Sequence, residues 1–239
     1  PVHNKLGEIE FKNITLDFVN KNIFASGSHL IMDESVKMTG ESNIDLYGGL
    51  FETEVTSSNL TLNGGTFNNV YGGGSSLEGI VLGNINILLG KNVLVKGNVY
   101  GGSDSDKTGS KESSGTTTIN LIGGTVNGDI VGGGKNSKST VFNKIVINYG
   151  DNNSEGVTEG TANNNININI NKNAKFDIIA GFSNINVSSG VTLNVSKALK
   201  YDAGISSKSN GKVKLLGGSS IYIPNTPVEE NRKIGQLET

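Results

Sequence analysis

Two polar segments of the chain carry oxygen-bearing side chains at alternate positions, a spacing that suits a calcium ion. The first segment contains Asp104, Asp106, Thr108, Gly109 and Glu112, and the second contains Asp151, Asn153, Glu155, Gly156 and Glu159. A loop that wraps Ca²⁺ presents oxygens at alternate positions and uses a Gly at the sixth position for its sharp turn. The twelfth position, where a bidentate Glu is usual, is Gly115 in one segment and Ala162 in the other. Two hypotheses therefore stay open. Either the oxygen-bearing residues hold calcium, or the segments are solvated polar loops that hold no metal.

Four of the six tyrosines directly precede a glycine, and they are Tyr47, Tyr71, Tyr100 and Tyr149. If these rings face outward in register, they form an aromatic stripe against which a sugar ring can pack. We take the four tyrosines as candidate ligand-binding residues on this ground. The alternative is a ladder that packs inward or lies under the following loop, and the absence of Trp favours it.

The chain holds few of the residues on which enzymes depend. It has no Cys, two histidines (His3 and His29) and a single arginine, Arg232. The chain therefore lacks the Cys for a thiolate nucleophile and has almost no His for a zinc site or a serine triad. Cleavage of a polysaccharide requires two juxtaposed carboxylates, or a metal ion with a base nearby. We expect no catalytic residues, and keep a calcium-dependent polysaccharide-binding or lyase-like module as an alternative.

Charge and hydropathy exclude two classes of partner. The formal net charge is −2, with 20 Lys and Arg against 22 Asp and Glu, so the chain lacks the basic surface that binds nucleic acid. No run of about 18 apolar residues occurs, so we expect no membrane insertion.

A repeated glycine phrase shows which elements must position these residues. The phrase occupies residues 64–74, 93–102 and 123–134, and its marker glycines Gly48, Gly72, Gly101 and Gly132 lie 24, 29 and 31 residues apart. The next similar glycine, Gly181, lies 49 residues further on, which leaves room for two repeats. Short repeats of variable length with a constant phrase are typical of a solenoid that carries variable loops.

The residues within each repeat predict strands, corners and loops. Ile166 to Ile170 alternates Ile with Asn, which predicts a strand with Ile in the core and an outer Asn ladder. The pairs 68–69, 97–98 and 128–129 consist of Asn, Gly and Asp, so we predict a left-handed bend at each. Four loops are expected to leave the solenoid at the same phase and to crowd one side of it. These loops are Ser75 to Gly79, Ser103 to Gly115, Lys135 to Thr140, and Asp151 to Thr161.

The glycine phrase at 64–74 and 123–134, with a looser copy at 93–102, resembles the β-helical repeats of large bacterial surface proteins and adhesins, mostly Gram-positive. The resemblance covers residues 43–150 well and the rest of the chain only in general composition. It implies a right-handed parallel β-helix displayed outside the cell, on the bacterial surface or in secreted form. With the repeats, it predicts an all-β, single-stranded β-solenoid of roughly eight or nine coils with irregular loops.

Three regions and one function follow from these observations. We expect N-terminal coils or a cap at 1–42, β-helix repeats at 43–223, and a polar, Pro-containing linker to a following module at 224–239. The expected function is a non-catalytic adhesin or ligand-display module, a monomeric segment of a larger protein, that binds a polysaccharide or a host-surface glycan or protein through its loops. The alternative of a structural spacer without a ligand stays open.

Overall fold

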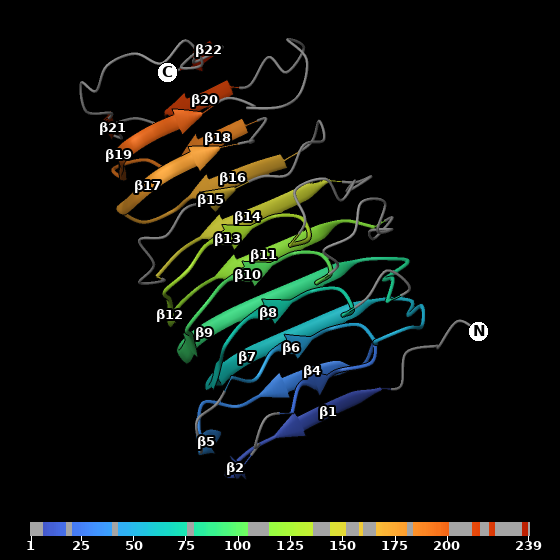
Figure 1. Ribbon diagram of the computed structural model, residues 1–239. Helices are drawn as coiled ribbons and strands as arrows, with labels where there is room; N and C mark the ends of the chain where they lie inside the picture. The colour runs from blue at the N-terminus through green and yellow to red at the C-terminus, as the bar shows by residue number, and fades with distance from the viewer. Residues whose placement is uncertain are drawn as a thin grey trace.

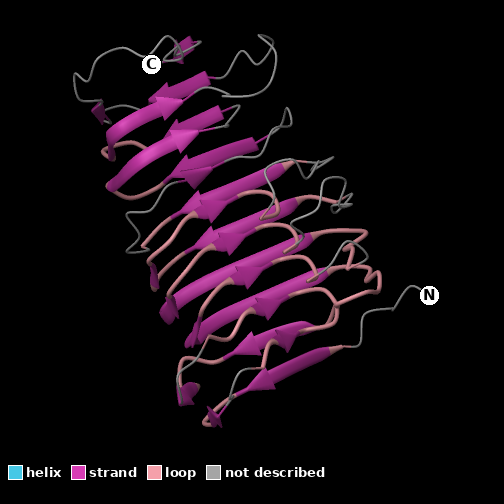
Figure 2. Ribbon diagram, in the orientation of Figure 1, coloured by secondary structure: helices cyan, strands magenta, loops and turns pink. Residues whose placement is uncertain are grey.

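The computed structural model contains strands and no helices in the part of the chain that it describes (Figure 2). The described residues are 7–17, 21–39, 43–75, 79–104, 115–135, 144–151, 158–159, 166–180, 184–200, 212–215, 220–222 and 236–238. Since no described segment is helical, none is a long apolar helix that could cross a membrane.

Most strands belong to two sheets in which every pairing is parallel. The first sheet contains, in spatial order, β1 (Glu8–Phe11), β4 (His29–Met32), β7 (Ser58–Phe67), β9 (Ile85–Val95), β11 (Thr117–Leu121), β14 (Ile145–Tyr149), β16 (Ile166–Ile170), β18 (Asn184–Val187), β20 (Lys212–Leu215) and β22 (Gln236–Glu238), with β12 (Thr125–Val126) beside β9. The second sheet contains β3 (Ile23–Phe24), β6 (Leu46–Tyr47), β8 (Val70–Tyr71), β10 (Val99–Tyr100), β13 (Ile130–Val131), β15 (Thr158–Glu159), β17 (Ala174–Ala180), β19 (Thr192–Lys200) and β21 (Ser220–Tyr222). A small third sheet pairs β2 (Thr15–Asp17) with β5 (Lys37–Thr39).

Strands of the first and second sheets largely alternate along the chain, and each strand pairs with its counterpart from the previous pass. The passes are therefore stacked from the N-terminal to the C-terminal end, as Figure 1 shows. This arrangement confirms the all-β, parallel-stranded class and is consistent with a β-solenoid.

Alternation within the strands puts one face of each sheet in the core. In β14, Ile145, Ile147 and Tyr149 are buried, whereas Val146 and Asn148 are partly exposed. The predicted alternation also holds in β16, where Ile168 and Ile170 are fully buried and Asn169 is partly exposed. The buried side chains form one apolar cluster that extends from Ala25 to Leu193. Burial of each large aliphatic side chain in it stabilises the fold by about 1.5–3 kcal/mol.

The chain bends at Asn68, Gly97 and Gly128, as predicted, but the left-handed conformation predicted for 68–69, 97–98 and 128–129 is wrong. None of these residues has a positive φ; the left-handed glycines of the repeats are Gly65 and Gly124, with φ of 103° and 72°. Glycine occurs at Gly97 and Gly128 for a different reason, because the side-chain amide of an asparagine in the preceding pass fills the space that a Cβ would need.

The wide interval between Gly132 and Gly181 contains an additional pass, as the spacing predicted. The strand β15 pairs with β13 on one side and with β17 on the other, which aligns Val131, Glu159 and Ala180. The stack therefore continues through this region.

The two terminal regions contribute strands to the same sheets. Within 1–42, β1, β3 and β4 belong to the two main sheets, although Ile9 on β1 is 43% exposed. Within 224–239, the short strand β22 pairs with β20, and the other residues of that region lie outside the described ones. Their assignment as a cap and a linker stays a prediction.

Candidate functional site at the tyrosine ladder

Four aromatic rings form a continuous stack along the second sheet. Phe24, Tyr47, Tyr71 and Tyr100 end the consecutive strands β3, β6, β8 and β10, which brings them into register. Adjacent ring centroids lie 4.9, 4.8 and 4.9 Å apart, and the rings are within 11° of parallel. We call these four residues the tyrosine ladder.

The tyrosine ladder lies on the face of the second sheet that is opposite to the main core. Successive side chains of a strand point to opposite faces, and Val70 and Val99 belong to the main apolar cluster. The tyrosines that follow them form a separate cluster with Val131. Tyr47 and Tyr71 are nevertheless only 1% exposed and Tyr100 is 8% exposed, so the ladder is buried.

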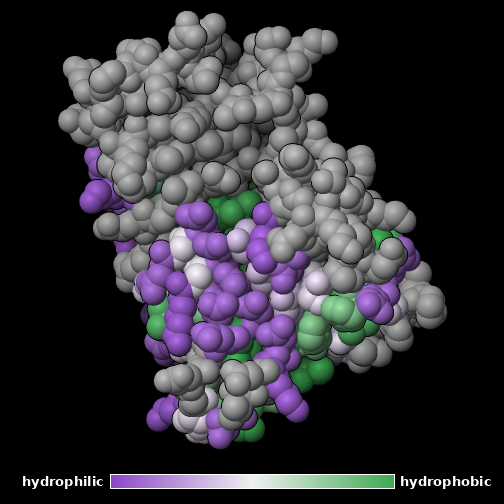
Figure 3. Space-filling view, viewed as in Figure 1, coloured by the Kyte–Doolittle hydropathy of each residue, from purple (hydrophilic) through white to green (hydrophobic). Residues whose placement is uncertain are grey.

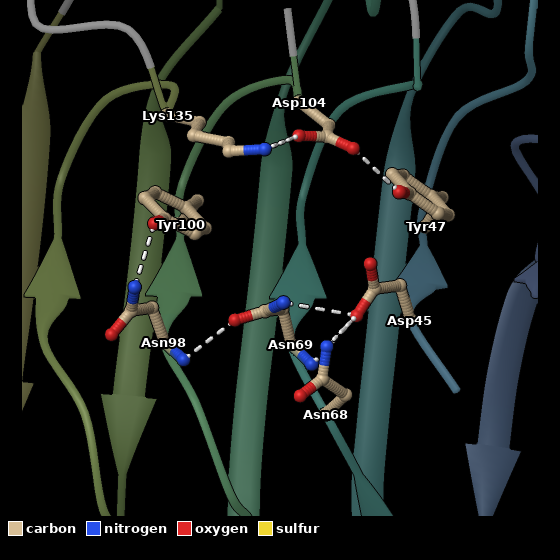
Figure 4. A network of polar contacts seen from close by, with 8 residues as sticks. All are labelled: Asp45, Tyr47, Asn68, Asn69, Asn98, Tyr100, Asp104 and Lys135. Atoms are coloured by element: carbon tan, nitrogen blue, oxygen red, sulfur yellow. Dashed lines mark hydrogen bonds and ion pairs between the residues drawn. The ribbon is translucent and has the colours of Figure 1, made fainter. Parts of the chain in front are cut away.

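A polar row borders the ladder at the positions two residues before each tyrosine, where the chain is about to enter each strand (Figure 4). Asp45 Oδ1 accepts a hydrogen bond from the backbone N–H of Asn69 at 3.0 Å, and Asn69 Oδ1 accepts one from the backbone N–H of Asn98 at 2.8 Å. Asn98 Oδ1 then accepts from the backbone N–H of Asp129 at 2.6 Å. Each side chain thus fixes the start of the strand in the next pass, which is a structural role.

An ion pair lies on the opposite side of the tyrosines from the polar row (Figure 4). The Tyr47 hydroxyl donates to Asp104 Oδ2 at 2.8 Å, and Lys135 Nζ lies 2.9 Å from Asp104 Oδ1 (Figure 4). Asp104 and Lys135 also stack through the backbone, since Asp104 N donates to the Gly74 carbonyl at 3.0 Å and Lys135 N donates to the Ser103 carbonyl at 2.9 Å. The two residues therefore link the starts of successive loops to the tyrosine ladder.

Burial and the neighbouring carboxylate suppress ionisation of the ladder. Desolvation raises the pKa of Tyr47 far above its ordinary value of 10.0, and the hydrogen bond to Asp104 raises it further. Desolvation likewise raises the pKa of Tyr71, followed by the charge of Asp104. The pKa of Tyr100 is also raised by burial, although the hydrogen bond that Asn98 donates to its hydroxyl lowers it. The phenols are thus neutral hydrogen-bonding groups and poor general bases.

The four candidate tyrosines do not form one outward stripe. Three of them stack with their ring faces covered by one another, so those faces are not available to a sugar. Tyr149 lies in the first sheet, in register with Leu121 and Ile170, and packs edge-on against Phe176 at 5.0 Å. Its place before a glycine is therefore no sign that it belongs to the ladder.

The two predicted calcium segments begin at different places in the fold. Asp104 follows β10 of the second sheet, whereas Asp151 follows β14 of the first sheet, so the expectation that all four loops share one phase is wrong for the loop from Asp151 to Thr161. Asp151 is exposed and lies 3.5 Å from Lys172 Nζ. Glu159 lies in β15, paired with Val131.

The other predicted ligands lie outside the described residues, and they are Asp106, Thr108, Glu112, Asn153 and Glu155. Among the residues that the structure does describe, no three His, Cys, Asp or Glu side chains come together as a metal site. The calcium hypothesis stays a prediction.

A depression of about 280 Å³ lies beside β7 and β9, next to the residues that directly follow β4 and β11. It is lined by Asp33, Glu34, Asn63, Gly90, Lys91 and Ile122. Ser35 donates two hydrogen bonds to Asp33 Oδ1, at 2.6 Å from its hydroxyl and 3.0 Å from its backbone, and these bonds lower the pKa of Asp33. The Asp33 carboxylate is thus held ionised by a local turn.

Two polar features of the site are absent from the sequence predictions. The first is the row from Asp45 to Asp129, which the recurrence of Asn or Asp two residues before each ladder position could have indicated. The second is Lys135, whose partner Asp104 lies 31 positions earlier, one repeat away. Only the stacking of the repeats brings this pair together.

Comparison with known proteins adds no relative. No protein-family model matches the chain, and no curated protein or solved structure is detectably similar to it.

Proposed function

We propose that this chain is a non-catalytic ligand-display module of a bacterial surface protein, which binds a polysaccharide or a host glycan through loops on one side of a rigid stack. In this proposal the stack is a right-handed parallel β-helix of roughly eight or nine coils and acts outside the cell. The observation that carries the proposal is the alignment of loop starts. Ser75, Asp104 and Lys135 follow successive strands of the second sheet. The backbone N–H of Asp104 donates to the carbonyl of Gly74, which precedes Ser75, and an ion pair joins Asp104 to Lys135.

This alignment suits polyvalent binding. Loops that start in register on neighbouring passes present their side chains at a regular spacing of about 4.8 Å per pass. Variable insertions on one side of a repeat protein commonly form its binding face. Residues at these loop starts, such as Asp104 and Lys135, are anchored to the tyrosine ladder, so the scaffold fixes where each loop begins.

The proposal is tested with a glycan array and shortened loops. We would replace residues 105–114 or 136–143 with a minimal Gly-Ser linker and keep Asp104 and Lys135 intact. The matched control shortens 152–157, which follows the first sheet. The proposal predicts that the parent chain binds a subset of glycans, that the first two variants lose binding, and that the control retains it. Equal binding by all four proteins would refute the role of these loops.

A spacer without a ligand is the second candidate, because the stack is continuous. Backbone and aromatic stacking runs without a break from β3 to β10, which suits a stiff stalk. A parent chain that binds no glycan or host-surface protein would favour the spacer.

Calcium binding is tested separately by calorimetry and by thermal melting with and without a chelator. If the polar segments hold calcium, the ion releases or absorbs heat on binding and raises the melting temperature, and Asp104→Ala combined with Asp151→Ala abolishes both effects. The absence of heat and of a melting shift would identify them as solvated loops.

A further inference from the structure

We infer that the outer face of the first sheet is a second binding surface, and that its ligand is an extended, uncharged polysaccharide that lies along the stack. This inference rests on the proposed function, since it assumes that the module binds glycans. It goes beyond that function by naming another surface and the class of sugar polymer that this surface fits.

The centre of this surface is a ladder of side-chain amides. Asn120, Asn148, Asn169 and Asn186 occupy equivalent outward positions on β11, β14, β16 and β18. The side-chain Nδ2 of each later residue donates to Oδ1 of the one before, at 2.7, 2.7 and 2.8 Å. We call these four residues the amide ladder.

The amide ladder leaves hydrogen-bonding capacity on its outer side. A side-chain amide has two N–H donors and an oxygen with two lone pairs. At Asn148 and Asn169 the ladder uses one N–H and one lone pair, so one donor and one acceptor remain at each rung. These residues are partly exposed, so the remaining groups can reach a ligand.

The second column of the surface lies two residues earlier on β11, β14 and β16, at Thr118, Val146 and Asn167. It extends to β9, where Asn86 is in register with Thr118. Asn86 continues this column toward Asn59, to which it donates a hydrogen bond at 2.7 Å. The surface is therefore two columns wide over several consecutive strands. Figure 3 shows that hydrophilic residues also dominate the described part of the side of the molecule that it draws.

Charge decides the class of ligand. The strands β11, β14, β16 and β18 contain no charged residue. On the next strand, β20, Lys212 and Lys214 are in register with Asn184 and Asn186, so the uncharged part of the surface ends at β18. An acidic polysaccharide or a nucleic acid would find no cation on these strands to neutralise it. A protein partner would need a more apolar centre than Val146 and Leu88, the residue of β9 in register with Asn120, supply. An uncharged polysaccharide matches a surface of amides and hydroxyls, because its own groups are hydroxyls and acetamides that both donate and accept.

Spacing gives the orientation of the polymer. Neighbouring strands of a sheet lie about 4.8 Å apart, which is close to the length of one pyranose unit in an extended chain. A polymer that runs along the stack would thus place one sugar over each strand, with successive sugars meeting successive rungs of the amide ladder.

The test uses the full chain in binding assays with microcrystalline cellulose, chitin, mannan and a β-1,3-glucan, with polygalacturonate as an anionic comparison. The principal variants are Thr118→Lys and Val146→Lys, which add a bulky charge beside the amide ladder without removing any of its hydrogen bonds. The matched control is Thr39→Lys, because Thr39 is exposed on β5, in the separate two-stranded sheet. Melting temperatures of all four proteins establish that the variants are folded.

The inference predicts that the parent chain binds at least one uncharged polymer. It also predicts that each principal variant weakens binding about tenfold or more and that Thr39→Lys changes it less than about twofold. If the parent binds and both principal variants bind equally well, this surface is not the site, although the proposed function stands. If only polygalacturonate binds, the ligand class is wrong. If none of the five polymers binds, the inference fails, and the glycan array with loop variants still decides the proposed function.

Discussion

Replacement of Tyr71 by Ala tests how much the tyrosine ladder stabilises the stack. Tyr71 is the central tyrosine, with Tyr47 at 4.8 Å on one side and Tyr100 at 4.9 Å on the other, and only 1% of it is exposed. Truncation of a fully buried aromatic side chain to Ala lowers the free energy of unfolding by about 3–5 kcal/mol. About 1–3 kcal/mol of this loss would come from the two ring contacts, at about 0.5–1.5 kcal/mol each.

Urea denaturation followed by far-UV circular dichroism measures this change. We expect Tyr71→Ala to lower the free energy of unfolding by about 3–5 kcal/mol, which corresponds to a fall in melting temperature of roughly 10 °C for a chain of this size. Tyr71→Phe keeps the ring, so we expect a loss of about 1 kcal/mol or less.

The matched control is Phe51→Ala, since Phe51 is 55% exposed. We expect that change to lower the free energy of unfolding by less than about 1 kcal/mol. If Tyr71→Ala is no more destabilising than Phe51→Ala, then the stacked rings do not hold neighbouring passes together and the reasoning is wrong.

Three further predictions concern the backbone, the ladder phenols and the ion pair. Gly124 and Gly190 both have φ of 72°, but a Cβ at Gly124 would lie 2.6 Å from the Val93 carbonyl oxygen, whereas Gly190 has open space around it. In urea denaturation, Gly124→Ala should therefore lower the free energy of unfolding by about 1–3 kcal/mol more than Gly190→Ala, and equal losses would contradict a clash between this Cβ and the Val93 carbonyl. Because burial raises the folded-state pKa values of Tyr47 and Tyr71, the stability that these phenols contribute is present below the unfolded pKa of 10.0 and is lost as the pH rises above it. The melting temperature should therefore fall with pH above about 10, less steeply in Tyr71→Phe than in the parent chain, and the same slope in both proteins would contradict the burial of this phenol. A double-mutant cycle of Asp104→Asn and Lys135→Met should give a coupling energy of about 1 kcal/mol, reduced by high salt, and a coupling near zero would show that the ion pair is not stabilising.

The alternating pattern made the strands of the stack predictable, because a period of two has the same consequence in any sheet. In β16 the alternation of Ile with Asn is enough by itself to indicate both the buried positions and the outer Asn ladder. The glycine spacing also indicated the additional pass between Gly132 and Gly181.

The details of the site were less predictable, because they depend on which sheet a strand joins. Tyr149 and Asp151 have local sequences like those of Tyr100 and Asp104. However, Tyr149 ends β14, which belongs to the first sheet, so Tyr149 and Asp151 lie away from the tyrosine ladder. Gly97 and Gly128 suggested left-handed bends, whereas an amide from the preceding pass is what requires glycine there. Contacts between repeats, such as Asp104 with Lys135, arise from stacking and leave no local signal in the sequence.

We propose, above all, that this chain binds a glycan without changing it. The most direct test is calorimetric titration of the full chain with a glycan selected on the array, followed by chromatography of the recovered sugar after long incubation with and without calcium. We expect saturable binding and a sugar of unchanged length that lacks unsaturated ends. Shortened or unsaturated products would show that the chain is an enzyme and that this proposal is wrong.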